Sequence, residues 1–108
     1  MISGKVITLC GSTKFKKEFE EWNIKLTGMG NVVFSVVCFT HADNLNISEN
    51  EKEMFDKMHL KKIDLSDTIF VIDVNGYIGN STKKEIEYAR KYGKEVIFMS
   101  EFIKKEGS

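Results

Sequence analysis

The sequence contains no proline and only two cysteines, Cys10 and Cys38, among its 108 residues. Without proline, turns must be made by the eight glycines and by Asn, Asp and Ser. Two cysteines and no recognisable secretory segment favour reduced thiols in the cytosol over a disulfide framework. We therefore expect a cytoplasmic protein whose fold does not depend on disulfides.

An excess of charge is also lacking, because 16 Lys and Arg balance 16 Asp and Glu. A neutral chain has no global field to attract a nucleic acid polymer or an anionic membrane. The longest apolar runs, such as residues 31–39, are far shorter than the roughly 20 residues of a membrane-spanning helix. We therefore expect neither partner, and any bound anion must be held by local groups.

Enough apolar sequence is present, 42% of the residues, for one hydrophobic core. We predict a single domain over residues 1–103 and a flexible tail over residues 104–108. Apolar runs typical of strands alternate with segments of helical spacing. Strands are predicted at residues 5–10, 32–39, 68–74 and 95–99, and helices at residues 14–28, 48–66 and 81–93.

Local signals support these elements. Ser48 and Glu51 have the spacing of a capping box, and Ser81 is predicted to cap the third helix, which Gly93 ends. The nearly continuous apolar run at residues 32–39 is typical of a strand covered on both faces. Together the elements predict a small doubly wound α/β sandwich, with a mainly parallel sheet of four to five strands and helices on both faces.

Ligands of open parallel sheets bind beyond the carboxyl ends of the strands. Gly11, Ser12 and Thr13 follow the first strand there and open a helix, so that backbone amides, hydroxyls and the helix dipole converge on a site suited to phosphate. A plain turn with a helix cap accounts for the same residues, and both interpretations stay open. Asp67 precedes a strand and is assigned to the opposite edge.

Lysines crowd two helix N-termini at this edge, although the helix dipole opposes each cation by about 0.3–1 kcal/mol. They are Lys14, Lys16, Lys17, Lys83 and Lys84. A bound anion would remove the conflict. Extension of these long side chains into water would remove it equally well.

Three further side chains near this edge could act on a ligand. Glu85 lies about one turn into the third helix, whose N-terminus should favour the ionised carboxylate, a nucleophile or electrostatic stabiliser. His59 and Asp56, one turn apart on the second helix, could shuttle protons. The alternatives to these chemical roles are that Glu85 is an ordinary surface residue of the helix and that His59 only packs against its neighbours.

Other residues with chemical potential give less specific signals. Tyr77, in a glycine-flanked loop, could stack on a base or ribose, whereas the helical spacing of Phe15, Phe19 and Trp22 predicts core packing. No pair of Cys or His has metal-ligand spacing, so we predict no structural metal. The second histidine, His41, falls in the polar loop after the second strand.

Three segments resemble the nucleoside 2-deoxyribosyltransferase-like superfamily, which includes deoxynucleoside 5′-monophosphate N-glycosidases. They are residues 10–13 (CGST), 59–74 (HLKKIDLSDTIFVIDV) and 76–89 (GYIGNSTKKEIEYA). The resemblance implies a flavodoxin-like or Rossmann-like sandwich that cleaves or exchanges the N-glycosidic bond of a nucleoside or nucleotide. It also implies a homodimer or larger assembly with sites near subunit boundaries, and no cofactor is expected.

The resemblance also assigns roles by motif. Glu85 resembles the family's nucleophilic glutamate, which attacks the anomeric carbon to give a glycosyl-enzyme ester that water or a second base resolves. The segment from Gly11 to Thr13 resembles the part that holds the sugar or its 5′ substituent. The loop of Gly79, Asn80 and Ser81 resembles one that touches a 5′-phosphate.

One position departs from the family pattern. His59 stands where the family commonly has an acidic residue, which Asp56 could replace. His59 could also protonate the leaving base itself, which would make the activity sensitive to pH around its titration range. The alternative is a non-catalytic module that sequesters or senses a nucleotide.

Overall fold

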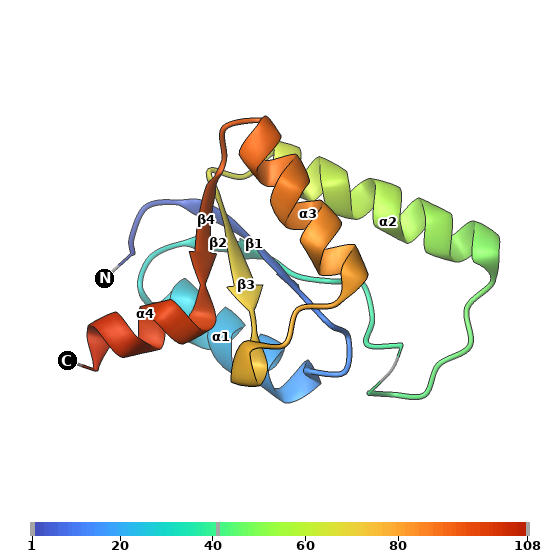
Figure 1. Ribbon diagram of the computed structural model, residues 1–108, viewed down its shortest axis with the longest axis horizontal. Coiled ribbons are helices and arrows are strands. Elements are labelled where there is room, and N and C mark those ends of the chain that lie inside the picture. Colours follow the sequence, from blue (N-terminus) through green and yellow to red (C-terminus); the bar gives the residue numbers. More distant parts are fainter. Residues whose placement is uncertain (1, 41, 108) are drawn as a thin grey trace.

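The structure, a computed structural model, describes residues 2–40 and 42–107, so that His41 lies outside the described residues. In this part of the chain, four parallel strands form one sheet in the order β2-β1-β3-β4, accompanied by four α-helices (Figure 1). The elements are β1 (Val6–Gly11), α1 (Lys16–Gly28), β2 (Val32–Phe34), α2 (Glu49–Asp64), β3 (Thr68–Ile72), the 3₁₀ turn η1 (Val74–Gly76), α3 (Asn80–Lys91), β4 (Glu95–Phe98) and α4 (Met99–Glu106). The predicted doubly wound α/β fold is confirmed.

Helices cover both faces of the sheet, with α1 and α4 on one face and α2 and α3 on the other (Figure 1). Successive side chains of a strand point to opposite faces. In β1, Leu9 therefore joins the core beneath α1, whereas Cys10 joins the core beneath α2 and α3. The predicted burial of Phe19 and Trp22 on α1 is confirmed.

The second strand is much shorter than predicted. Only Val32–Phe34 pairs with β1, at the edge of the sheet, and the chain then leaves the sheet. Val32 and Val37 are 55% and 58% exposed, so the prediction of a strand covered on both faces is wrong. An apolar run alone does not distinguish a central strand from an edge strand followed by an apolar loop.

The C-terminal helix α4 was not predicted. Phe102 is buried against Trp22 and Phe70, with ring centroids 5.7 Å from each, and so ties α4 to the sheet. The helix continues to Glu106, through residues for which a flexible tail was predicted. Ser108 lies outside the described residues.

The helix ends follow local chemistry, with one exception. The capping box is confirmed: the Ser48 amide donates to Glu51 at 3.0 Å, and the Glu51 amide donates to the Ser48 hydroxyl at 3.1 Å. Helix α3 begins two residues earlier than predicted, because Gly79 is its N-cap and Ser81 lies inside the helix. Gly93, with a φ of +71°, follows its end as expected.

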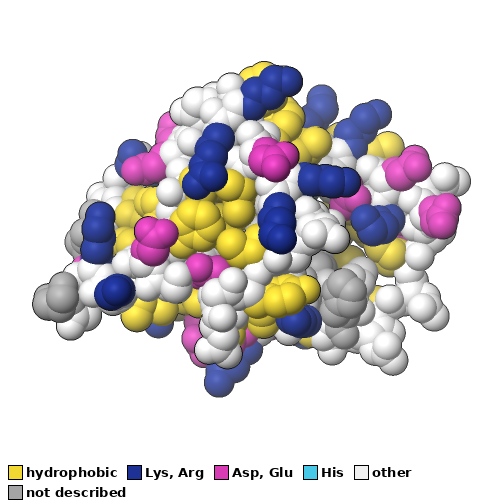
Figure 2. All heavy atoms as spheres, viewed as in Figure 1, with side chains coloured by type: hydrophobic (Ala, Val, Ile, Leu, Met, Phe, Trp, Pro, Cys, Tyr) yellow, Lys and Arg dark blue, Asp and Glu magenta, His cyan; other side chains and the backbone are white. Residues whose placement is uncertain are grey.

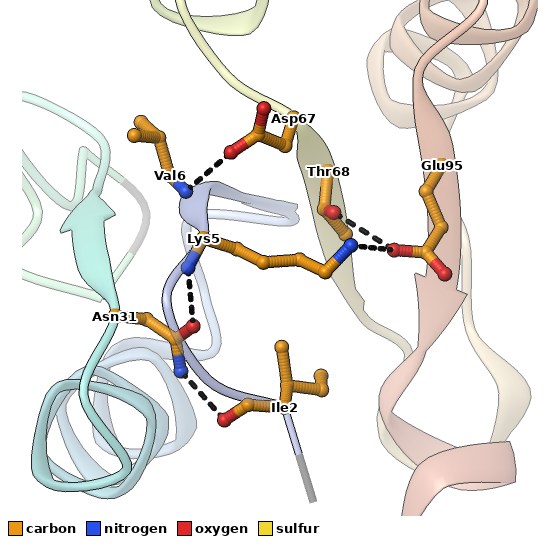
Figure 3. Close-up of polar contacts among 7 residues, drawn as sticks. All are labelled: Ile2, Lys5, Val6, Asn31, Asp67, Thr68 and Glu95. Atoms are coloured by element: carbon orange, nitrogen blue, oxygen red, sulfur yellow. Dashed lines mark hydrogen bonds and ion pairs between the residues drawn. The ribbon is translucent and has the colours of Figure 1, made fainter.

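The amino-terminal edge of the sheet is held by polar contacts (Figure 3). The carboxylate of Asp67 accepts a hydrogen bond from the Val6 amide at 2.8 Å, and Glu95 accepts one from the Thr68 hydroxyl at 2.9 Å. The Lys5 ammonium lies 3.6 Å from Glu95. Asp67 therefore joins strands at the edge to which the sequence assigned it.

Figure 2 shows cationic and anionic side chains interspersed over one face of the molecule. Among the described residues, no helix is long and apolar enough to cross a membrane.

Candidate functional site

A pocket of about 410 Å³ lies beyond the carboxyl ends of β1 and β3. All ten side chains and glycines predicted to act on a ligand line it: Gly11, Ser12, Thr13, Asp56, His59, Tyr77, Gly79, Asn80, Ser81 and Glu85. The rest of the wall comes from α2, from α3 and from the segment after β2, of which residues 38–47 were expected at this edge: Val36, Val37, Cys38, Thr40, Ile47, Lys52, Phe55, Lys62 and Thr82.

The turn after β1 requires glycine at its first position. Gly11 has a φ of +153°, and a Cβ there would lie 2.9 Å from the carbonyl oxygen of Ile72. The next residues form a turn in which the Phe15 amide donates to the Ser12 carbonyl at 3.1 Å. Across the pocket wall, the hydroxyls of Thr13 and Thr40 are hydrogen-bonded at 3.2 Å. The close approach of β1 to β3 thus brings this turn to the pocket.

The loop between β3 and α3 supplies the opposite wall. Tyr77 is 47% exposed and packs edge-on against Phe15, with ring centroids 5.9 Å apart. The ammonium of Lys14 lies 3.7 Å from the centre of the Tyr77 ring. A base that stacks on this face of Tyr77 would therefore have to displace an ammonium group.

At the inner end of the pocket, three side chains from three elements meet. The carboxylate Oε1 of Glu85 on α3 lies 3.7 Å from Nε2 of His59 on α2. The same Nε2 lies 3.5 Å from Sγ of Cys10 on β1, and the Cys10 thiol also hydrogen-bonds to Glu85. The side chains of His59 and Glu85 are 9% and 20% exposed, and Cys10 is fully buried.

Burial decides the charge of Glu85. It raises the pKa of this carboxyl group to about 7, although the hydrogen bond from Cys10 lowers it. The expectation that the N-terminus of α3 favours the ionised form is wrong, because the dipole acts mainly in the first turn and Glu85 lies beyond it. Both the protonated and the ionised form of Glu85 are therefore accessible near neutral pH.

His59 is neutral at pH 7. Burial, with the nearby charge of Lys62, lowers its pKa to about 4. The Asp56 carboxylate binds the Lys52 ammonium at 2.8 Å on the exposed side of α2. The titration range of His59 therefore lies well below neutral pH, and Asp56 has a lysine as its ion-pair partner.

The cations of the pocket are different from those predicted. Among the described lining residues, Lys52 and Lys62 of α2 carry positive charge, and none of the five lysines singled out in the sequence contributes. One of those five, Lys16, binds Asp43 at 2.8 Å. Lys62 donates to the Ser35 carbonyl at 2.7 Å and thereby joins α2 to the segment after β2.

Cys10 is the member of the inner cluster that sequence reasoning missed. Its thiol, the His59 imidazole and the Glu85 carboxylate offer three ligand atoms within 4.8 Å of one another. The prediction of no structural metal considered only spacing along the chain, which does not detect residues that meet from separate elements. Alternation along β1 was the available signal, because it places Cys10 on the face of α2 and α3.

No protein-family model matches the chain, and no curated protein matches it either. The fold alone does not identify the chemistry of the site, because an α/β sandwich supports many functions.

Proposed function

We propose that this protein is an N-glycosidase or 2-deoxyribosyltransferase that acts on a nucleoside or its 5′-monophosphate, with Glu85 as nucleophile. One observation carries the proposal: a buried carboxyl group lies at the inner end of a pocket formed by the turn at residues 11–13 and the loop at residues 77–81. The volume of about 410 Å³ suits a small ligand. The sequence resemblance of the same segments points to the same chemistry.

In the proposed reaction, the ionised Glu85 attacks C1′ of the sugar. The C1′–N bond breaks with its electron pair going to the base, a C1′–O bond to Glu85 forms, and the transition state resembles an oxocarbenium ion. The departing base takes a proton from water in the pocket, because His59 is neutral at pH 7. Water or a second base then cleaves the ester and regenerates the carboxylate.

Two neighbours prepare Glu85 for this step. The Cys10 thiol donates a hydrogen bond that favours the ionised carboxylate, and the charge of Lys52 acts in the same direction. The surrounding apolar groups limit hydration of the carboxylate, which leaves it a stronger nucleophile once ionised. Glu85 therefore combines a pKa near neutrality with a fixed position.

The other end of the pocket suits a 5′-phosphate. Gly79, Asn80 and Ser81 form the start of α3, where backbone amides and the helix dipole favour anions. Lys52 and Lys62 add positive charge to the wall formed by α2. We therefore expect the monophosphate to be the better substrate.

The test is release of free base from a panel of nucleosides and 5′-monophosphates, followed by chromatography. Glu85→Gln should reduce the rate by about 10³-fold or more, as expected for loss of a nucleophile. Glu87→Gln is the matched control, because Glu87 is exposed on the same helix. No release from any member of the panel, or equal rates for Glu85→Gln and wild type, would overturn the proposal.

A second candidate is a module that binds a nucleotide without cleaving it. It is favoured by the neutral His59, since the pocket then offers no imidazolium to protonate the departing base. Calorimetry with recovery of intact ligand would support it. Turnover of the bound nucleotide would exclude it.

We further propose a homodimer or larger assembly that works in the cytoplasm. Val37, which lines the pocket, is 58% exposed, and Leu45 and Met54, which flank lining residues in the sequence, are 47% and 54% exposed. Helix α2, which carries Met54, extends beyond the sheet in Figure 1. Both cysteines are free, which suits a reducing compartment. Light scattering tests the assembly, and a mass equal to the 12.4 kDa of one chain would contradict it.

A further inference from the structure

Cys10, His59 and Glu85 bring a thiol, an imidazole and a carboxyl group to one point. They come from the central strand β1 and from α2 and α3, the two helices that pack on the face of the sheet to which Cys10 points. Their ligand atoms lie within 4.8 Å of one another, and the glycosidase proposal uses only the contact of Cys10 with Glu85. We propose that these three side chains form a zinc-binding site.

The distances fit a tetrahedral ion. Zinc binds sulfur at about 2.3 Å and nitrogen or carboxylate oxygen at about 2.0–2.1 Å, so tetrahedral angles separate sulfur from nitrogen by about 3.6 Å and nitrogen from oxygen by about 3.3 Å. The observed separations are 3.5 Å between Cys10 and His59, and 3.7 Å between His59 and Glu85. The third pair, Cys10 and Glu85, is within 4.8 Å, so binding requires the Glu85 carboxylate, which ends a flexible side chain, to adjust toward the other two ligands.

The donor set selects the metal. A thiolate and an imidazole favour zinc over Mg²⁺ and Ca²⁺, which prefer oxygen ligands. The two negative ligands, Cys10 and Glu85, balance the charge of the ion, as a buried site requires. The positive charges of Lys52 and Lys62 oppose binding from the α2 side, and Asp56 offsets them.

The fourth coordination position faces the pocket, because His59 and Glu85 both line it whereas Cys10 lies behind them. Three protein ligands with one open position are typical of zinc sites that hold a water or substrate. When zinc binds, the Cys10 thiol gives its proton to the buffer and a sulfur–zinc bond forms. The zinc site does not depend on the proposed function, and zinc on Glu85 would occupy the carboxylate that attacks C1′.

Cobalt absorption spectroscopy tests the site on the full chain after treatment with a chelator. Co²⁺ should produce a thiolate-to-cobalt charge-transfer band at one ion per chain, and Zn²⁺ should abolish the band by displacing the cobalt. Cys10→Ser should remove the band. Cys38→Ser is the matched control and should retain it, since Cys38 also lines the pocket but lies outside the cluster.

Because Cys10 is fully buried, Cys10→Ser could lose the cobalt band by unfolding, so circular dichroism is used to check that this variant is folded. Glu85→Gln provides a second test that keeps both cysteines, and it should weaken cobalt binding by at least about tenfold. Absence of the band in the wild type would overturn the proposal. So would a band that survives Cys10→Ser and disappears in Cys38→Ser, which would assign the metal to the more exposed thiol.

Discussion

Glu85 and His59 should have opposite effects on the pH dependence of stability. Burial raises the pKa of Glu85 from 4.5 to about 7 and lowers that of His59 from 6.5 to about 4. One pH unit of difference corresponds to 1.36 kcal/mol, so each group changes the free energy of unfolding by about 3 kcal/mol across its window. Both side chains are at least four-fifths removed from solvent, which limits screening.

The signs follow from which state binds the proton more tightly. The native state holds the Glu85 proton more tightly than the unfolded chain does, so the contribution of Glu85 is full below pH 4.5 and is lost as the pH rises to about 7. The native state resists protonation of His59, so its contribution is full above pH 6.5 and is lost as the pH falls to about 4. Between pH 4.5 and 6.5 the two effects nearly cancel in the wild type.

Urea unfolding between pH 4.5 and 7.5, with a chelator present, measures both effects. Relative to wild type, Glu85→Gln should gain about 3 kcal/mol of stability as the pH rises, because only the His59 dependence remains. His59→Gln should lose a similar amount over the same range. Cys10, Asp56 and the charged neighbours are present in all three proteins, so their contributions to the pH dependence cancel in the differences. Differences that do not change with pH would refute the assigned burial effects.

Two further predictions concern the framework of the site. Gly11→Ala should destabilise the protein by about 1–3 kcal/mol in urea unfolding, because its Cβ would lie 2.9 Å from the Ile72 carbonyl oxygen at a φ of +153°. Gly28→Ala is the control and should not destabilise the protein, because there is open space around its Cβ. Equal effects of the two substitutions would argue against the steric explanation. Ser48→Ala should lower the free energy of unfolding by about 1 kcal/mol in the same assay, because the capping box of α2 is lost. The control is Ser3→Ala, because Ser3 is exposed. An effect of Ser48→Ala no larger than that of the control would show that the cap contributes nothing measurable.

The sequence carried the alternation of strands and helices well, because β1 and β3 are buried runs bounded by clear turn residues. The second strand and α4 were misjudged for different reasons. The apolar residues after Phe34 line the pocket instead of pairing in the sheet, and sequence alone does not separate these two uses. The spacing of Met99, Phe102 and Ile103 is helical and was a usable signal for α4.

A general rule about sheets predicted a site at the carboxyl edge, and the ten residues singled out by that rule, by helix spacing and by the resemblance all line one pocket. The ionisation of Glu85 and His59 was beyond this rule, because pKa values depend on burial by residues from other elements. The contact of Cys10 with His59 and Glu85 likewise needed the packing of α2 and α3 on β1. The sequence thus predicted where the site residues lie in the fold, but not whether Glu85 and His59 are charged.

The short outer strands of the sheet have a consequence for association between molecules. The sheet ends on one side at β2, with three residues, and on the other at β4, with four. Unpaired peptide groups on an outer strand are templates for strand addition and aggregation, and their number grows with strand length. So few peptide groups on each border should discourage continuous sheets from forming between molecules, even though the central strands are strongly apolar.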